Sequence, residues 1–428
     1  MKTVQTGFAG LSLLVVLLAT GCNSDTLETD MPIGADDTSN DGFTIETVML
    51  GDRPSSLVAL LPDGDLKTRL ETCDVSAVRP QAFSIAHRGA PLEFPEHSVE
   101  GYEAAASQGA GIIECDVTFT SDRELVCRHS QCDLHTTTDI LATDLAQNCS
   151  VPPDMDAAAP FENVQCCTSD LTLAEFRTLR AKRDGANSAG ATLEEYLAGT
   201  PGWTNDEEMD YGTLLTHAES ITLFNGFGVS MTPELKEPAV DMPYEGNYTQ
   251  TAYAQQMIDE YTAAGISPDR VFAQSFLLDD VLYWISATPE FGEQAVFLDG
   301  RYAVEGFNPD DASTFVPGMQ ELVDQGVNYL APPMPFLVTL DEQQDIVPSV
   351  YANEANANGL KLITWTLERS GSLEDGGGFY YTSINEVIDD DGDALRLLDV
   401  LAKDVGVTGV FSDWPATTTF YAHCTDLE

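Results

Sequence analysis

The sequence predicts an α/β fold with a largely parallel sheet, and an eight-stranded (β/α)8 or TIM barrel fits it best. From about residue 83 onward, short apolar runs alternate with stretches that have the composition of helices. The apolar runs are hydrophobic on both faces, as in parallel strands buried under helices. About eight strand–helix units suit a barrel with an insertion, and an open doubly wound sheet is the alternative. No Gly-rich nucleotide-binding loop follows a predicted strand, which weakens the nucleotide-binding forms of that alternative.

The predicted elements follow one another in regular order. Strands are expected over 83–87, 111–117, 125–129, 229–236, 271–276, 295–298, 329–331, 360–366 and 409–412. Helices are expected over 97–108, 173–181, 251–264, 279–287, 317–325, 349–358 and 394–405. Several of these helices are followed by a glycine that favours a helix end, at Gly109, Gly265, Gly326 and Gly359. We therefore assign 83–424 to the barrel domain.

A long segment of about 130–227, after the third predicted strand, interrupts this order. It is rich in Cys, Pro, Asp and Thr. Loops of this length are usually functional or form a small subdomain. We expect this insertion to cover the mouth of the barrel and to influence which substrate enters.

The first residues have the pattern of a targeting segment. Lys2 precedes an apolar run over 11–18 that is too short to cross a bilayer, and the run closes on Ala19-Thr20-Gly21-Cys22. This ending resembles a bacterial lipoprotein cleavage site, which implies a signal peptide over 1–22 and lipidation of Cys22. Ordinary signal-peptide cleavage is the alternative. In either case we expect export, and with lipidation a membrane-anchored bacterial lipoprotein that faces the periplasm or the cell surface.

Residues 23–82 are expected to form an acidic tether, to about residue 41, and then an N-terminal extension. The whole chain is strongly acidic, with 70 acidic against 19 basic residues and a formal net charge of -51. Such a surface repels nucleic acid and anionic membranes, so no nucleic-acid partner is expected, and membrane contact is expected only through a lipid anchor at Cys22. The sequence does not indicate an oligomeric state.

The cysteine count suits an exported protein. Without Cys22, eight cysteines remain, and an even number outside the cytosol favours disulfides. Those between residues 132 and 167 are expected to cross-link the insertion, and Cys73 with Cys424 is a candidate bridge between the chain ends. Cys127 is expected to be a buried core residue. No group of Cys and His has zinc-site spacing.

Charged residues stand repeatedly where predicted strands end. The strands of a parallel barrel place reactive groups at their carboxyl ends. The first ends in His87-Arg88-Gly89, the second carries Glu114-Cys115-Asp116, the third ends in His129, and a later one ends in Glu234-Leu235-Lys236. Core packing does not explain this pattern, so we interpret these residues as a site.

Their spacing indicates a metal centre. Residues two apart on a strand share a face, so Glu114 and Asp116 point together and Cys115 points away. With Glu234 they form an all-oxygen set for a hard divalent cation, Ca2+ or Mg2+. His87 and His129 suit an acid and a base on either side of a phosphorus atom. Arg88 can clamp a phosphate.

The ordered set of motifs resembles the glycerophosphodiester phosphodiesterase family, most closely its bacterial periplasmic, calcium-using branch. The matching segments are Ala86-His87-Arg88-Gly89-Ala90, Phe94-Pro95-Glu96-His97-Ser98, Glu114-Cys115-Asp116-Val117, Pro233-Glu234-Leu235-Lys236, Gln274-Ser275-Phe276, Thr364-Trp365-Thr366 and the run over 409–415.

The resemblance implies a barrel of the phospholipase-C-like phosphodiesterase type and hydrolysis of glycerophosphodiesters, such as glycerophosphocholine or glycerophosphoethanolamine, to glycerol 3-phosphate and an alcohol. The residue roles that it implies are metal ligation by Glu114, Asp116 and Glu234 with Ca2+ favoured, acid–base catalysis by His87 and His129, phosphate binding by Arg88 and Lys236, and possible pocket lining by Gln274 and Trp365.

One departure from the family pattern concerns the second histidine. Ser130 follows His129 where the family usually has Asp, a residue that can orient or tune the histidine. Two alternatives to the main hypothesis are a related barrel phospholipase or sphingomyelinase D-type phosphodiesterase, and a catalytically silent surface-binding lipoprotein.

Overall fold

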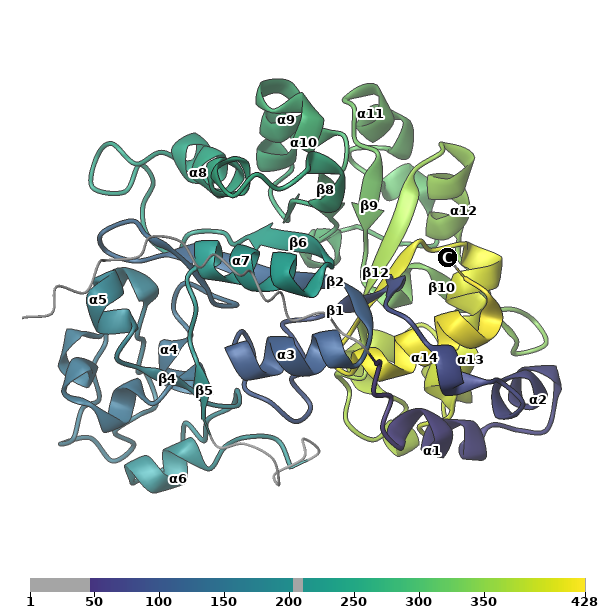
Figure 1. Cartoon of the computed structure of the whole chain (residues 1–428), viewed down its shortest axis with the longest axis horizontal. Helices are drawn as coiled ribbons and strands as arrows, with labels where there is room; N and C mark the ends of the chain where they lie inside the picture. The colour runs from purple at the N-terminus through teal and green to yellow at the C-terminus, as the bar shows by residue number, and fades with distance from the viewer. Residues whose placement is uncertain (1–46, 203–210, 428) are drawn as a thin grey trace, which may run out of the picture. The chain divides into compact units, whose positions relative to one another are not determined.

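Eight parallel strands form a closed barrel in the computed structural model, which describes residues 47–202 and 211–427 (Figure 1). The strands are β1 (Gln81–Ala86), β2 (Ala110–Phe119), β6 (Ser230–Leu235), β7 (Gln274–Ser275), β8 (Val296–Leu298), β9 (Tyr329–Ala331), β12 (Lys361–Leu367) and β13 (Gly409–Ser412). They pair in this order, and β1 pairs in parallel with both β2 and β13, which closes the ring. The predicted barrel is therefore confirmed and the open sheet is excluded.

Helices surround the ring. They are α3 (Val99–Ser107), α7 (His217–Phe227), α8 (Gln250–Ala263), α9 (Leu278–Ala287), α10 (Pro289–Gly292), α11 (Met319–Asp324), α12 (Val350–Ala357), α13 (Asp393–Val400) and α14 (Pro415–Thr425). A large apolar core lies between sheet and helices, and a smaller cluster that includes Ile85, Ile363 and Phe411 fills the barrel interior. A two-stranded antiparallel ribbon, β10 (Val338–Leu340) with β11 (Ile346–Pro348), follows β9.

Three predicted elements differ from the structure. The helix predicted over 173–181 covers only Leu173–Phe176, because Arg180–Ala181 form a short strand that pairs with Gly212–Thr213. The strand predicted over 125–129 is β3 (Leu125–Cys127), which runs antiparallel to β2 and lies outside the ring. The insertion predicted to end near 227 ends earlier, because its last residues form α7, which packs on β2 and β6. The signals for α7 are local: Thr216 and Glu219 form a capping box, and Gly228 ends the helix with a φ of 75°.

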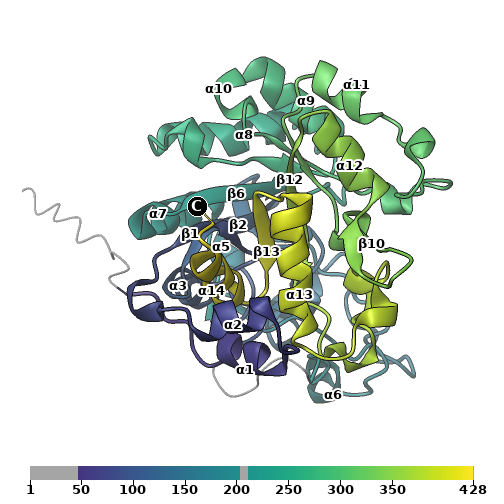
Figure 2. The same cartoon turned by 90° about the vertical axis from the view of Figure 1, so that its right-hand side faces the viewer.

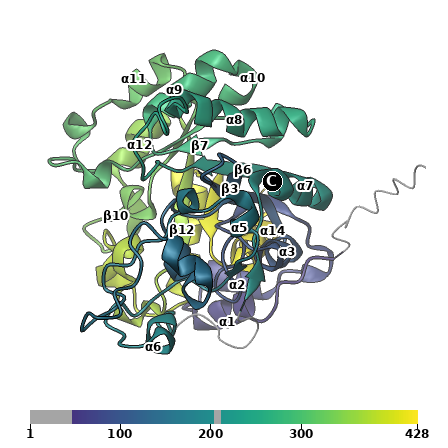
Figure 3. The same ribbon diagram turned by 90° about the vertical axis from the view of Figure 1, so that its left-hand side faces the viewer.

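The insertion has a small core of its own and lies on one side of the barrel (Figures 1 and 3). Its elements are short: α4 (Leu134–Thr137), α5 (Leu173–Phe176), β4 (Arg180–Ala181), α6 (Leu193–Leu197) and β5 (Gly212–Thr213). The disulfides Cys132–Cys167 and Cys149–Cys166 cross-link it, as the sequence predicts.

The N-terminal extension folds onto the barrel. Its helices α1 (Arg53–Leu60) and α2 (Asp65–Glu71) pack beside α14 (Figure 2). The disulfide Cys73–Cys424 joins this extension to α14, which confirms that predicted pair. Cys22 and the signal segment lie outside the described residues. No helix in residues 47–202 and 211–427 is long and apolar enough to cross a membrane.

Candidate active site

A cavity of about 510 Å³ opens at the carboxyl ends of the barrel strands. Most of the residues that the sequence singles out line it: His87, Arg88, Glu114, His129, Glu234, Lys236 and Trp365. Asp116 is buried beside Glu114 and Glu234. Gln274 is also fully buried and does not line the cavity; its amide donates a hydrogen bond of 2.9 Å to Glu114 Oε1.

Three buried carboxylates converge at this cavity, two that line it and Asp116 beside them. Ligand atoms of Glu114, Asp116 and Glu234 all lie within 4.8 Å of one another. The register of the sheet produces this group, because Asp116 on β2 pairs with Glu234 on β6, and Glu114 lies two residues before Asp116 on the same strand. The alternation predicted for Glu114, Cys115 and Asp116 is thus present.

The electrostatics of this group favour a bound cation. Burial, with the charges of Asp116 and Glu234, raises the pKa of Glu114 well above its usual range. Burial also raises the pKa of Glu234 to about 7, although Lys236 opposes the shift. Asp116 Oδ1 is buried without a hydrogen-bond partner. Closely spaced hard oxygen donors with an unsatisfied atom fit a hard divalent cation such as Ca2+ or Mg2+.

His87 is held by a carboxylate that the sequence analysis missed. Asp413, directly after β13, lies 2.5 Å from His87 Nδ1, and Arg369 donates to the other oxygen of Asp413 at 2.8 Å. With Nδ1–H donating to Asp413, Nε2 remains for proton transfer; it lies 4.0 Å from Glu114 Oε2. Burial, followed by the charge of Arg88, lowers the pKa of His87 to about 4, against the opposing charge of Asp413. Asp413 directly follows the strand predicted over 409–412, and this position is the sequence feature that could have identified it as a site residue.

Arg88 is fixed by a second carboxylate that the sequence analysis did not assign. Arg88 Nη1 donates to Glu96 Oε2 at 3.1 Å, and the backbone N–H of Arg88 donates to Glu114 at 3.0 Å. The turn needs Gly89, whose φ is 103° and where a Cβ would lie 2.9 Å from the backbone of Gly101. Burial would raise the pKa of Glu96, but the guanidinium groups of Arg88 and Arg369 hold this pKa well below its usual range.

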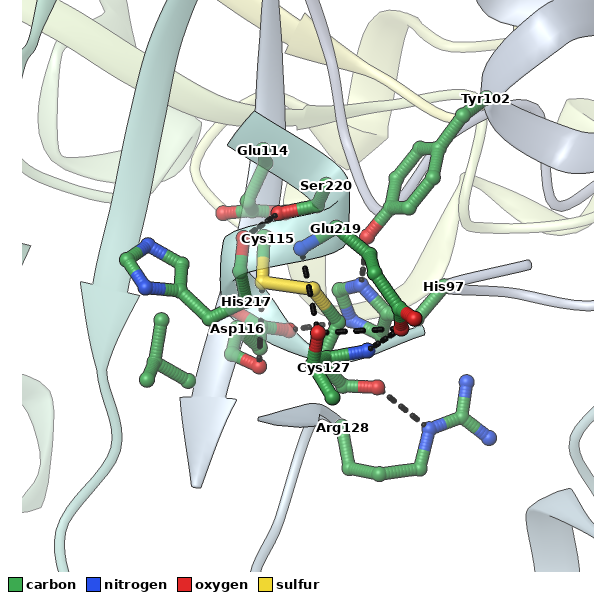
Figure 4. The surroundings of a disulfide bond; sticks show 12 residues. His97, Tyr102, Glu114, Cys115, Asp116, Cys127, Arg128, His217, Glu219 and Ser220 are labelled. Atoms are coloured by element: carbon green, nitrogen blue, oxygen red, sulfur yellow. Dashed lines mark hydrogen bonds and ion pairs between the residues drawn. A yellow bond between two sulfur atoms is a disulfide. The ribbon is translucent and has the colours of Figure 1, made fainter. Parts of the chain in front are cut away.

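Asp116 on β2 is held by a histidine (Figure 4). His97 Nε2 lies 2.8 Å from Asp116 Oδ2, and His97 Nδ1 lies 2.8 Å from the Tyr102 hydroxyl. A histidine that bridges a carboxylate to a second polar group fixes the orientation of that carboxylate. On the opposite face of β2, Cys115 forms a disulfide with Cys127 of β3. Cys127 is buried as predicted, but the bridge itself was missed, because it depends on the antiparallel pairing of β3.

His129 enters the cavity from the segment after β3. It is partly buried, and its desolvation together with the charges of Arg88 and Lys236 holds its pKa well below the usual range. In the described part of the chain no carboxylate is hydrogen-bonded to His129, in contrast to His87. The backbone N–H of Ser130 instead donates to Asp133 Oδ2 at 3.0 Å, so Asp133 stabilises the turn that carries His129.

Lys236 completes the polar part of the cavity. Its Nζ lies 2.5 Å from Glu234 Oε1 and 6.0 Å from the centre of the Phe276 ring. Burial would lower the pKa of Lys236, but Glu234 and Asp116 raise it above its ordinary value. Lys236 therefore stays charged and is available to an anionic group in the cavity.

Comparisons with known proteins identify the family that this chain resembles. The model of the Glycerophosphoryl diester phosphodiesterase family matches residues 87–417. A fungal relative described as "Extracellular protein", from Arthroderma benhamiae, is 47% identical over 248 residues, which cover 57% of this chain and all of the relative. A glycerophosphodiester phosphodiesterase of Arabidopsis thaliana is 23% identical over 357 residues, 79% of this chain and 85% of that protein.

Solved structures agree at the level of the fold. A protein of Silicibacter pomeroyi, described as a glycerophosphoryl diester phosphodiesterase, superposes with a TM-score of 0.52 at 18% identity, over 84% of this chain and 98% of that one. This likeness supports the barrel and, at such low identity, nothing finer.

Proposed function

The chain belongs to the glycerophosphoryl diester phosphodiesterase family, and on that premise we propose that it hydrolyses small glycerophosphodiesters to glycerol 3-phosphate and an alcohol. The observation that carries the proposal is the convergence of three carboxylates, two histidines, Arg88 and Lys236 on one cavity. Few other reactions need acid–base groups, a cation site and phosphate-binding cations together.

The proposed cofactor is one divalent cation, with Ca2+ favoured and Mg2+ as the alternative. Glu114, Asp116 and Glu234 would hold it, since they present the close set of oxygen donors described above. When bound, the cation would neutralise charge on the phosphate and on the carboxylates. Arg88 and Lys236 are the proposed phosphate-binding side chains, because both line the cavity with their charges held by neighbouring carboxylates.

The proposed acid and base are His87 and His129. One histidine removes a proton from the attacking hydroxyl, which is water or the 2-hydroxyl of the glycerol. Attack by the 2-hydroxyl forms a cyclic phosphate, which a water molecule then opens to glycerol 3-phosphate. The other donates a proton to the oxygen of the leaving alcohol, so that the phosphorus–oxygen bond breaks without releasing an alkoxide. Asp413 orients His87 for its part by fixing Nδ1.

Turnover on several glycerophosphodiesters tests the proposal. We expect release of glycerol 3-phosphate from glycerophosphocholine and glycerophosphoethanolamine with Ca2+, abolished by EDTA and restored by added cation. Product identity also distinguishes the alternatives: a phospholipase D-type enzyme would act on intact phospholipid, and a binding protein would release nothing. Unchanged turnover after chelation would contradict the metal-dependent mechanism.

We also propose that the protein is exported. Four disulfides join described residues, which is typical of oxidising compartments, and the fungal relative is described as extracellular. Lipidation of Cys22 remains a prediction from the sequence. Mass spectrometry of the mature N-terminal peptide tests it: a diacylglyceryl modification on Cys22 supports an anchor, and an unmodified peptide that begins elsewhere contradicts it.

A further inference from the structure

One wall of the active-site cavity is built from aromatic rings. Four rings contact one another in sequence: Trp365 and Tyr302 have centroids 6.3 Å apart, Tyr302 and Phe379 5.6 Å, Phe379 and Tyr380 5.2 Å, and Tyr380 and Trp365 6.3 Å. Phe276 lies against Trp365 at 5.8 Å. All five rings, which we call the aromatic wall, line the cavity that holds the reacting groups.

The wall has a fixed base and an exposed rim. The indole N–H of Trp365 donates to the carbonyl of Ala331 at 2.9 Å, which holds that ring in place. Tyr302 and Phe379 are 50% and 45% exposed. Large aromatic side chains gathered at the mouth of a polar cavity are better explained by a ligand than by the core, because here they leave apolar surface in contact with water.

The composition of the wall favours a cation over an acyl chain. Among the described residues that line the cavity, Leu298 is the single aliphatic one, whereas a groove for an acyl chain would be largely aliphatic. Aromatic faces attract cations through their negative quadrupole, and Lys236 Nζ already lies over Phe276. Asp184 of the insertion adds a carboxylate to the same cavity.

The geometry points to a specific head group, and we propose that the aromatic wall binds the quaternary ammonium of a choline-like alcohol. This inference rests on the proposed phosphodiesterase function. A phosphate near Arg88 and Lys236 would leave an ammonium two carbons away on the neighbouring wall. A quaternary ammonium has no donors and presents apolar methyl groups to the rings, whereas a primary ammonium would have to turn its donors away from the rings toward an acceptor such as Asp184.

Three substrates separate charge from shape. They are glycerophosphocholine, glycerophosphoethanolamine, and the ester of 3,3-dimethylbutanol, in which carbon replaces the choline nitrogen. We expect kcat/KM for glycerophosphocholine to exceed that for the neutral isostere roughly 3- to 30-fold, the range of a cation–π contact. Tyr302→Leu and Phe379→Leu keep an apolar side chain but remove the ring, so each should bring this ratio toward one. Tyr283→Leu, a partly buried ring on α9 whose hydroxyl donates to Gln255, is the matched control and should leave the ratio unchanged.

The outcomes separate this inference from the function on which it rests. Hydrolysis of all three substrates at similar kcat/KM would overturn the head-group assignment and leave the phosphodiesterase proposal standing. Equal losses on all three substrates in Tyr302→Leu would also overturn it, because the ring would then serve the glycerol or the fold. If no ester is hydrolysed, the phosphodiesterase proposal fails. The head-group inference is then tested by titrating the protein with tetramethylammonium and following tryptophan fluorescence. The absence of a saturable change, or the same change with the neutral tert-butanol, overturns the inference.

Discussion

Three side chains of this site are each held in place by a hydrogen-bonding partner. Asp413 holds His87, His97 holds Asp116, and Glu96 holds Arg88, each through a contact of 2.5 to 3.1 Å. Such partners fix the rotamer and the tautomer of a reactive group before substrate arrives. His129 departs from this arrangement, since Asp133 supports its turn rather than its ring.

Replacing His87 or His129 by alanine should lower kcat on glycerophosphocholine at least ~100-fold, which is the low end for loss of a general acid or base. His423→Ala on α14, where Nε2 lies 3.0 Å from the carbonyl of Asp74, is the control and should keep wild-type turnover. Near-normal kcat in His87→Ala or His129→Ala, measured with saturating cation, would contradict the assignment.

Asp413→Asn should lower kcat at least ~10-fold with little change in KM, because the amide keeps the shape but no longer fixes His87 as a donor at Nδ1. The charge of Asp413 raises the pKa of His87, so its loss lowers that pKa further. The limb of the kcat–pH profile that reports His87 should therefore move to lower pH. A limb that stays in place or moves to higher pH would refute this role.

Cation binding should stabilise the fold measurably. The apo protein holds three mutually repelling carboxylates, and a cation at 100 times its Kd contributes roughly 2.7 kcal/mol by mass action. We expect Ca2+ to raise Tm in the wild type and not in Glu234→Gln. Glu290→Gln on α10, an exposed acidic residue outside the cavity, is the control and should respond to Ca2+ as the wild type does. A Ca2+ response that survives in Glu234→Gln would place the cation elsewhere.

At the scale of elements, the hairpin of β2 and β3 decides where His129 lies. β3 is the edge strand of the sheet: it pairs with β2 over three positions, and on its other side it makes a single bridge from Val126 to Thr216. The Cys115–Cys127 disulfide adds a covalent link between β2, which carries Glu114 and Asp116, and the segment that carries His129. The link acts from the face opposite the cavity, because Cys115 points away from its two acidic neighbours (Figure 4).

The double variant Cys115→Ala with Cys127→Ala should lose kcat roughly 10-fold or more, at a temperature where it is folded, because a displaced histidine transfers protons poorly. It should also unfold more easily, by roughly 2–4 kcal/mol. The matched control is Cys132→Ala with Cys167→Ala in the insertion, which should lose stability without a comparable loss of kcat. Similar kcat losses in the two variants would show that the Cys115–Cys127 disulfide stabilises the fold and has no specific role in positioning His129.

At the scale of the whole molecule, charge sets the conditions of stability. The formal net charge is -51, so the acidic side chains of one chain repel one another. This repulsion is strongest in the folded state, where the charges are closest together. Short-range ion pairs such as Arg53–Glu368, which ties α1 to the residue after β12, offset only a small part of it.

Salt should therefore stabilise the protein. Raising NaCl from ~20 mM to ~300 mM shortens the Debye length from about 20 Å to about 6 Å and screens the repulsion. We expect Tm to rise by several degrees over this range, measured by calorimetry at neutral pH with the cation concentration held constant. A Tm that falls or stays level would show that local ion pairs, which salt weakens, dominate instead.

Much of this protein is determined by its sequence alone. The strand–helix order and its two-sided apolar runs predict the barrel, because hydrophobic periodicity is a local property. Side-chain alternation along β2 places Glu114 with Asp116, and the rule that barrel strands carry reactive groups at their carboxyl ends selects His87 and Lys236.

The tertiary structure decided what depends on contacts between distant segments. Asp413 contacts His87, 326 residues away in the sequence, because β1 and β13 are neighbours in the closed ring. No local sequence pattern predicts that these two residues pair. The Cys115–Cys127 bridge follows from the antiparallel direction of β3, which a three-residue strand does not encode in its periodicity. The aromatic wall likewise exists only after β7, β8 and β12 bring their loops together at one end of the barrel.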